Sequence, residues 1–412
     1  MIKCEIEIDK FLSHARNHKE GRDLFMHEKL KKTLALLLAA LAIASFAAGC
    51  GGTNSGGGGG SGGSGDEEEI LIGVMVPTSG SEAYYGTDMY QSYMLAVEEI
   101  NKAGGVLGRK LTLLQADDGC DSNIATSAAE LLISKNVDFV VGGYCSGATV
   151  AAMQLYFDED LLLLISAANS TGITQLGLDT CFMLNSPGSH AAVTLADLCK
   201  SVGSSKVALI HNGDEYPQNL SKLCEDELPK HGIEIATVQV VDKGASDVSS
   251  VVTAIRNAEA DFVYWCGYHA DGSNVIKQLR QGGYEGDIAV GDGSASVELI
   301  TACGDAGEGV YVTSPPFVRF AEGGDRFVAD FKAMHNLEPG AYATLAYDTI
   351  YVLKEAIEKA GTLDTGAVKD AVQNINYKGL SGTIKFTPDR ELEISNFIII
   401  QIVDGDFQLV TI

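Results

Sequence analysis

The sequence predicts an α/β protein made of two doubly wound lobes that are joined by a multi-strand hinge. From residue 69 onward, short apolar runs alternate with amphipathic segments of helical period. The runs are about five to seven residues long, which is typical of parallel strands buried on both faces. The alternation stops near residue 187 and restarts near residue 206. Two such β/α series predict two Rossmann-like lobes.

The first series contains four predicted strands separated by amphipathic helices. The strands are ILIGVMV (70–76), KLTLLQA (110–116), DFVVGG (138–143) and LLLLISAA (161–168). The helices are expected in YGTDMYQSYMLAVEEINKAGG (85–105), NIATSAAELLISK (123–135) and TVAAMQLYF (149–157). This order of elements favours a parallel sheet with helices on both faces.

The second series repeats the pattern with five predicted strands. They are KVALIHN (206–212), EIATVQVV (234–241), DFVYWCGY (261–268), DIAVGDG (287–293) and GVYVTSP (309–315). The helices between them are QNLSKLCEDELPKHG (218–232), VSSVVTAIRNAEA (248–260), SNVIKQLRQGG (273–283) and VELITACG (297–304). Two long helices at 323–336 and 342–361 follow, and then a β-rich tail with a hairpin at Asp404-Gly405.

The chain is expected to cross between the lobes near Ser186, near Pro315 and near residue 388. This assigns 67–187 plus 318–388 to an N-terminal lobe, and 188–317 plus 389–412 to a C-terminal lobe. Several crossing segments form a hinge that bends without letting the lobes separate.

The N-terminus is a targeting segment. Residues 1–25 precede a second candidate start, Met26, so their translation is doubtful. Residues 26–49 have a basic start and a short apolar run, and they end in FAAG before Cys50. That pattern resembles a bacterial lipobox, with Ala47 in place of the usual leucine, and predicts a lipoprotein signal peptide with Cys50 as the lipidated residue. An ordinary cleaved signal peptide or a membrane anchor is the alternative.

Residues 50–66 are rich in Gly and Ser and predict a flexible tether. A lipidated cysteine followed by such a tether predicts an extracytoplasmic domain that is lipid-anchored to the cell membrane. The chain carries a formal charge of -26 and has no basic stripe, which argues against nucleic acid as a partner.

Cys145 and Ser146 stand side by side in VGGYCSGAT, where a strand ends and a helix begins. This junction suggests either a nucleophile, as in a hydrolase, or a cradle for a bound anion. The predicted folded region has an odd number of cysteines, and none is spaced C-x-x-C, so zinc-ribbon and thioredoxin sites are disfavoured. The histidines are scattered and form no metal or triad pattern, so neither a metal nor any other cofactor is expected.

Unusual polar and aromatic side chains follow the carboxyl ends of the predicted strands, where ligands bind in open α/β sheets. They are Tyr85, Ser146, Asn169 and Ser170 in the first lobe, and Tyr216, Tyr268 and Asp292 in the second. If these edges face each other, they form a cleft with hydroxyl groups on one wall and an acid on the other.

Such a cleft suits a zwitterion. Ser146 and Ser170 stand at predicted helix starts, where free N–H groups favour a carboxylate. Asp292 lies between two glycines and could pair with an ammonium, to which Tyr268 would add a cation–π contact. Taken singly, the serines are equally well explained as N-caps, Asp292 as a turn residue and Tyr268 as packing.

Several longer stretches resemble the substrate-binding proteins of branched-chain amino acid (Leu/Ile/Val-type) ABC transporters. They are SGSEAYYG, EEINKAGGVLGRKL, DDGCDS, GGYCSGATV, ISAANST, DFVYWCGYHADG and SGTIKFTPD. The resemblance implies the type I periplasmic binding protein fold, in which two lobes close on a ligand like a flytrap. It also implies a disulfide between Cys120 and Cys145, which would exclude Cys145 as a nucleophile.

The resemblance further implies a ligand site. Ser146, Ala168 and Ser170 match positions that hold the α-carboxylate, and Tyr268 and Asp292 match those that hold the α-ammonium. Tyr85, Tyr216 and Tyr342 match those around the ligand's side chain. Asn169 replaces a small apolar residue near the pocket, and Asp292 replaces a glutamate.

We therefore expect a monomeric binding lipoprotein, not an enzyme, that captures a branched-chain or other apolar amino acid for an ABC permease. One alternative is a binding protein for another small polar solute, such as an amide, urea or an aromatic acid. Two others are a sensory ligand-binding domain and a hydrolase that uses Ser146.

Overall fold

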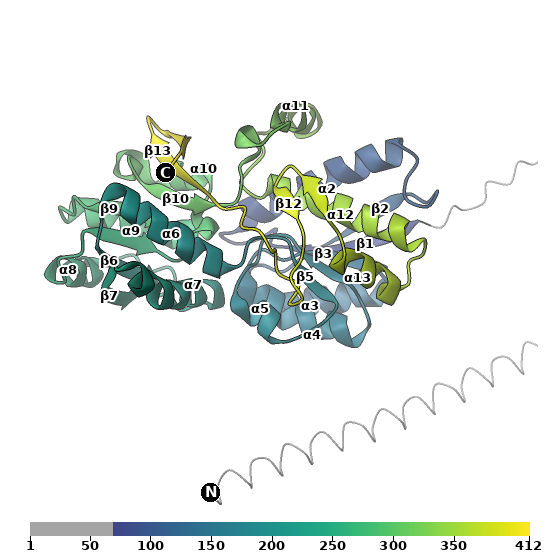
Figure 1. Ribbon diagram of the computed structural model, residues 1–412, viewed down its shortest axis with the longest axis horizontal. Coiled ribbons are helices and arrows are strands. Elements are labelled where there is room, and N and C mark those ends of the chain that lie inside the picture. The colour runs from purple at the N-terminus through teal and green to yellow at the C-terminus, as the bar shows by residue number, and fades with distance from the viewer. Residues whose placement is uncertain (1–68) are drawn as a thin grey trace, which may run out of the picture. The chain divides into compact units, whose positions relative to one another are not determined.

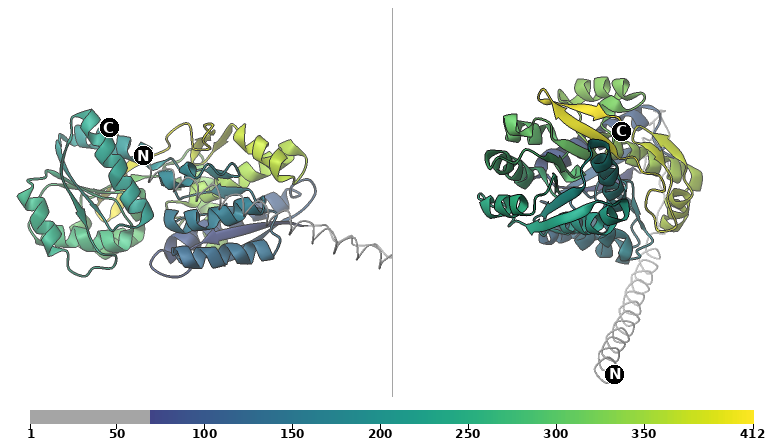
Figure 2. Two further views of the ribbon diagram at one scale, coloured as in Figure 1. Left: turned by 90° about the horizontal axis from the view of Figure 1, so that it is seen from below. Right: turned by 60° about the vertical axis from the view of Figure 1, so that its left-hand side comes forward.

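The structure, a computed structural model, describes residues 69–412, which form two lobes that are each built on a separate sheet (Figures 1 and 2). The predicted extension, signal peptide, lipidation site at Cys50 and Gly/Ser tether lie outside the described residues. The predicted fold class of two doubly wound α/β lobes is confirmed.

The first sheet has five strands, all parallel, in the order β2-β1-β3-β4-β5. The strands are β1 (Ile70–Val76), β2 (Leu111–Asp117), β3 (Phe139–Gly142), β4 (Leu163–Ile165) and β5 (Cys181–Met183). Six of the seven residues of β1 are buried, as expected for a central strand covered on both faces.

Helices cover both faces of the first sheet. They are α2 (Ala83–Lys102), α3 (Ser122–Ser134), α4 (Ser146–Asp158), α5 (Thr171–Gln175), α12 (Ala343–Ala360) and α13 (Thr365–Gln373). Helix α2 packs against α12, and α3 packs against α4 on the other side of the sheet (Figure 1). Gly86 allows α2 to begin close to the loop after β1, because a Cβ there would lie 1.7 Å from the Pro77 carbonyl oxygen.

The second sheet has seven strands in the order β14-β13-β10-β9-β8-β6-β7. Its parallel strands are β6 (Lys206–His211), β7 (Glu234–Val240), β8 (Phe262–Trp265), β9 (Asp287–Val290) and β10 (Tyr311–Ser314). The predicted tail hairpin is confirmed: β13 (Ile398–Val403) and β14 (Asp406–Val410) pair antiparallel around Asp404-Gly405 and extend the sheet at β10.

The helices of the second lobe follow the predicted alternation. They are α6 (Gly188–Val202), α7 (Glu215–Glu227), α8 (Ser249–Asn257), α9 (His269–Gln281) and α10 (Val297–Cys303), with short 3-10 turns η1 (Leu228–His231), η2 (Asp292–Ser294) and η3 (Gly304–Gly307). The η4 turn (Val318–Phe320) and α11 (Gly324–His335) then lead to α12, and a small hairpin of β11 (Tyr377–Gly379) and β12 (Gly382–Ile384) follows α13.

The chain crosses between the lobes three times. The crossings lie at 184–187, between β5 and α6, at 315–323, between β10 and α11, and at 394–397, before β13. The third crossing comes later than the predicted position near residue 388. The segment beyond 388 still belongs to the first lobe, because the Met183 N–H donates to the Arg390 carbonyl and Phe386 bridges to Leu392.

Some short elements were not predicted. Strand β5 and helix α5 have three and five residues, too few to show a period. Helix α13 was also missed. None of the helices in residues 69–412 has the length and apolarity that a membrane span requires.

Candidate functional site

The two lobes meet where the loops that follow their strands face one another. Asp292 lies in η2, directly after β9 of the second lobe, and is 1% exposed. Its Oδ1 accepts a hydrogen bond from the Tyr216 hydroxyl at 2.6 Å. Its Oδ2 accepts from the Nδ2 groups of Asn169 and Asn185, at 3.0 and 3.1 Å, and from the Tyr342 hydroxyl at 3.3 Å. One buried carboxylate therefore links residues from both lobes.

The residues that are hydrogen-bonded to Asp292 are all neutral, so hydrogen bonds and not a basic side chain stabilise its negative charge. Burial raises the pKa of its carboxyl group, and the donors Tyr216, Asn185 and Tyr342 act against that rise. The Tyr216 hydroxyl is fixed in its role as donor, because it also accepts the Gly293 N–H at 3.0 Å. A carboxylate held in this way is prepared to bind a cation that brings its own N–H donors.

Tyrosine side chains fill the space beside Asp292. The hydroxyl groups of Tyr85 and Tyr144 both donate to the Gly293 carbonyl, at 3.3 and 3.1 Å, and their rings stack at 4.6 Å. The Tyr342 ring lies edge-on to both, at 5.8 and 5.3 Å, and Tyr268 lies 5.8 Å from Tyr144. These rings form an apolar wall with polar rims.

The opposite wall is built around the start of α4. Ser146 is the first residue of α4, and its Oγ accepts the Ser170 N–H at 3.3 Å. The Ser170 Oγ donates to Glu215 Oε1 across the cleft at 3.1 Å. The Ala168 N–H donates to the Gly143 carbonyl at 2.9 Å, so in this conformation it is not available to a ligand. The first N–H groups of a helix have no partner within the helix, which leaves the start of α4 suited to an anion.

A cavity of about 190 Å³ opens beside the start of α4, between the lobes. It is lined by residues of both lobes, which include Gly147, Ala148, Glu215, Tyr268 and Lys243. Lys243 forms an ion pair with Asp214 at 2.8 Å.

The structure brings all nine predicted ligand residues to this interlobe region, although it gives some of them unexpected partners. Tyr216 and Tyr342 were expected beside the ligand's side chain, yet both donate to the Asp292 carboxylate. Asn169 was noted only as an unusual polar residue, and it bonds Asp292 directly. The ligand contacts assigned to these residues stay predictions.

Sequence reasoning missed three residues of the site: Glu82, Tyr144 and Asn185. Glu215 was noted among the polar residues after the predicted strand KVALIHN, but it was given no ligand role. Tyr144 lies inside VGGYCSGAT, after a strand, so the rule that selected Ser146 could have selected it as well. Asn185 lies at the first crossing between the lobes, and its role depends on a contact 107 residues away.

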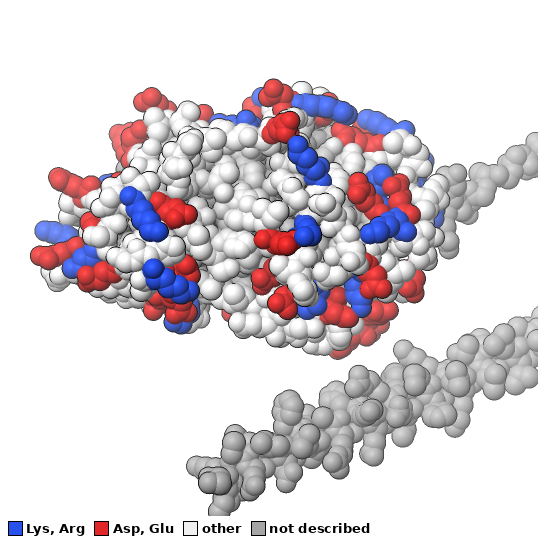
Figure 3. Space-filling view, in the orientation of Figure 1, with Lys and Arg blue, Asp and Glu red and all other residues white. Residues whose placement is uncertain are grey.

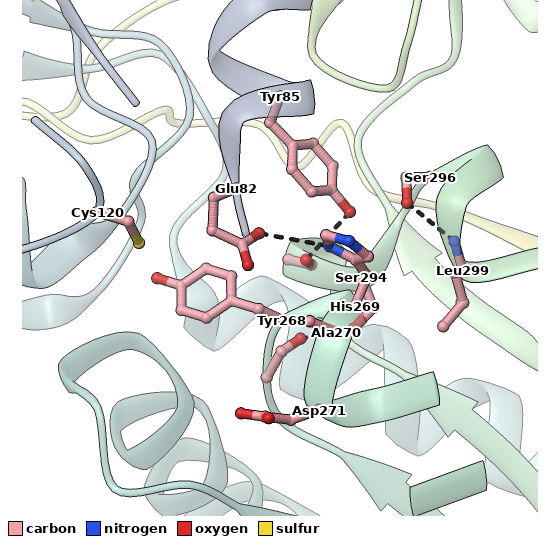
Figure 4. A network of polar contacts seen from close by, with 12 residues as sticks. Glu82, Tyr85, Cys120, Tyr268, His269, Ala270, Asp271, Ser294, Ser296 and Leu299 are labelled. Carbon is pink, nitrogen blue, oxygen red and sulfur yellow. Dashed lines mark hydrogen bonds and ion pairs between the residues drawn. The ribbon is translucent and has the colours of Figure 1, made fainter. Parts of the chain in front are cut away.

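Glu82 and His269 lie close together across the two lobes (Figure 4). Glu82 directly precedes α2 in the first lobe, and His269 begins α9 in the second. The His269 Nδ1 lies 3.5 Å from Glu82 Oε2. Figure 4 shows the Glu82 carboxylate facing His269 and the Tyr268 ring, with Tyr85 above them.

The predicted disulfide is confirmed: Cys120 and Cys145 are bonded, with their Cα atoms 5.3 Å apart. Cys145 is therefore no nucleophile. The bond ties the loop after β2 to the residue that precedes α4, next to Ser146. The five other cysteines of the described region are free and buried; they are Cys181, Cys199, Cys224, Cys266 and Cys303.

Comparison with known proteins gives consistent results. A family described as "Periplasmic binding protein" matches residues 69–406. The leucine-, isoleucine-, valine-, threonine-, and alanine-binding protein of Pseudomonas aeruginosa is 28% identical over 374 residues, which covers 90% of this chain and 95% of that protein.

Two solved structures share the fold. A leucine binding protein, LivK, from Thermotoga maritima has a TM-score of 0.78 and 23% identity, and the match covers 83% of this chain and 98% of that one. An ABC transporter solute binding protein from R. palustris, in complex with benzoate, has a TM-score of 0.75 and 17% identity, with coverage of 83% and 96%. Such proteins bind solutes and are not enzymes, in agreement with the prediction.

Proposed function

Because this chain belongs to the periplasmic binding protein family, and is of the type that serves branched-chain amino acid transporters, we propose that it captures a free amino acid outside the cytoplasm and delivers it to an ABC permease. The lobes would close on the ligand and open to release it, and no bond would be made or broken. The family match and the interlobe position of Asp292 together support this function.

The observation that carries the proposal is the Asp292 carboxylate, which is buried between the lobes and held only by neutral donors. An α-ammonium would replace some of these donors and supply the missing positive charge. Desolvation makes an uncompensated buried charge costly, so a cationic group gains more here than a neutral one.

The α-carboxylate would bind at the start of α4, near Ser146 and Ser170. A helix start favours an anion by its free N–H groups and by its dipole. The Ala168 N–H would join this set only if it left the Gly143 carbonyl, which opening of the cleft would have to permit.

The side chain of the ligand would lie against the tyrosine rings. Tyr85 and Tyr342 present apolar faces that suit an aliphatic chain. The name of the P. aeruginosa relative makes leucine, isoleucine and valine the first candidates.

Attachment to the membrane is a separate part of the proposal. The lipobox-like FAAGC predicts lipidation at Cys50, and the Gly/Ser-rich residues after it would form the tether. A monomer is sufficient for this function, because both walls of the cleft come from one chain.

A second candidate ligand is an aromatic acid. It is favoured by the R. palustris protein bound to benzoate and by the tyrosine cluster, against which an aromatic ring could stack. A benzoate-like ligand would have no cation for Asp292, and this difference separates the two candidates.

Isothermal titration calorimetry with the twenty amino acids and benzoate tests the proposal. Asp292→Asn should weaken amino acid binding by about 3 kcal/mol, or more than a hundredfold in Kd, because the ammonium would lose its buried counter-charge. Asp305→Asn, an exposed change in the same lobe, is the control and should leave the Kd unchanged. Equal Kd values for the wild type and Asp292→Asn would remove the ammonium assignment, and binding of benzoate alone would favour the aromatic acid.

A further inference from the structure

We infer that the ligand's side chain ends in a positively charged group, and that Glu82, Tyr85, Tyr144 and Tyr268 form the subsite for that group. This inference rests on the proposed capture of a free amino acid but replaces its branched-chain candidates: the substrate would be a basic amino acid, with an aliphatic stem between two ammonium groups.

Glu82 is the first reason. Its side chain is 3% exposed, and its Oε2 has no hydrogen bond within the described residues. Although it precedes α2, its carboxylate does not cap that helix. The nearby His269 Nδ1, 3.5 Å away, also lacks a hydrogen bond in this part of the chain. Burying a carboxylate oxygen without a hydrogen bond lowers the stability of the protein unless another group pairs with it. A cation on the ligand can be that group.

Aromatic rings around Glu82 are the second reason. Tyr85 lies edge-on to His269 at 5.5 Å and stacks on Tyr144, which in turn lies 5.8 Å from Tyr268. Burial raises the pKa of all three tyrosine hydroxyl groups, and the negative charge of Glu82 raises it further. Aromatic faces combined with a carboxylate are the usual means of binding an organic cation.

The geometry connects this subsite to Asp292. The hydroxyl groups of Tyr85 and Tyr144 donate to the carbonyl of Gly293, the residue after Asp292. Figure 4 shows the Glu82 carboxylate close to the hydroxyl end of Tyr85, so Glu82 and Asp292 lie near the same end of the two rings. A ligand with one ammonium group for each carboxylate would be an α,ω-diamino acid such as lysine or ornithine.

The charge of the surroundings favours the same ligand. The chain has 29 basic and 55 acidic residues, and on the face shown in Figure 3 the acidic side chains are interspersed with basic ones. Glu215 adds negative charge at the cavity beside α4, where Lys243 offsets the charge of Asp214. A negative field of this kind raises the local concentration of cations and speeds their association.

A purely structural role for Glu82 gives a different expectation. Glu82 and His269 belong to different lobes, so their contact could act only to hold the lobes together. In that case the loss of Glu82 would weaken the binding of every ligand by the same factor. If Glu82 belongs to a cation subsite, the affinity lost on its removal depends on the charge of the ligand's side chain.

The test uses lysine and norleucine, which differ by the terminal ammonium, together with cadaverine, which lacks the carboxylate. Calorimetry with the wild-type protein should give lysine a Kd at least about tenfold lower than that of norleucine. In Glu82→Gln this preference should fall to about threefold or less, and in the exposed control Glu130→Gln it should persist. The wild-type comparison does not depend on how well the variant folds.

Each result has a distinct meaning. If norleucine binds as tightly as lysine, or if Glu82→Gln weakens both equally, the inference is overturned while the proposed function stands. If cadaverine binds in a Glu82-dependent manner and no amino acid binds, the cation subsite stands and the amino acid function fails. If none of the three ligands, nor any other amino acid, binds, both are overturned.

Discussion

The Cys120–Cys145 disulfide allows a quantitative prediction of stability. The bonded residues are 25 apart in sequence. A closed loop of about 26 residues restricts the unfolded chain by an entropy that corresponds to about 3.5 kcal/mol at 25 °C. Removing the bond in the Cys120→Ala/Cys145→Ala variant should therefore destabilise the first lobe by about 3.5 kcal/mol. For a unit of this size, the melting temperature should fall by about 7–14 °C.

Differential scanning calorimetry with and without a phosphine reductant measures this effect. Reduction should lower the Tm of the wild type and leave that of the double variant unchanged. Cys181→Ala, which removes a free buried thiol from the same lobe, is the matched control and should cost only about 1–2 kcal/mol. A double variant no less stable than this control would refute the entropic argument. Its ligand affinity should also fall, because the bond fixes the residue before Ser146.

Three further predictions follow from buried groups. Burial raises the pKa of Asp88 to about 7 from its unfolded value of 3.8, so the stability associated with its proton is present below about pH 4 and lost as the pH rises through 7. Asp88→Asn should therefore flatten the fall in Tm between about pH 4 and pH 7, and parallel curves for Asp88→Asn and the wild type would contradict this. Asp348→Asn should lower the Tm, because the Asp348 oxygens accept three hydrogen bonds. Trp265, the single tryptophan, donates to the Tyr268 carbonyl at 2.9 Å, so its fluorescence should change when a ligand moves the Tyr268 loop; a constant signal during binding detected by calorimetry would exclude that movement. The free thiols should react slowly with iodoacetamide in the native protein and quickly in urea, as measured by mass spectrometry of peptides, because all are buried. Rapid native labelling of a thiol would show that the lobe that contains it opens readily. Burial raises the pKa of three of them to about 12: Cys181, Cys199 and Cys303.

Much of the fold could be predicted from the sequence, because period and apolar content are local properties. The run ILIGVMV matches β1 residue for residue. Elements of three to five residues, such as β5 and α5, escaped because so short a segment cannot display a period. The third crossing was placed too early, since the hydrogen bond between Met183 and Arg390 depends on tertiary contact and leaves no local pattern.

The site could be predicted in part. The expectation that ligand residues follow the carboxyl ends of the strands led to Ser146 and Asp292, which both lie in the loops between the lobes, because the topology of an open α/β sheet determines where its loops lie. Their ligand contacts stay predictions. The hydrogen bonds could not be predicted. Those from Asn169 and Asn185 to Asp292 join residues more than 100 positions apart, and they form only when the lobes approach each other. The Glu82–His269 pair was missed for the same reason.

The three crossings also limit how the protein can move. Two lobes joined by one linker can rotate about it in every direction, but two lobes joined by three linkers keep essentially one bending mode. Prolines restrict the backbone of two of these linkers, with Pro187 in the first and Pro315-Pro316 in the second. Entry and exit of a ligand would then follow the same path in reverse, so the residence time of the ligand would depend on linkers that never touch it.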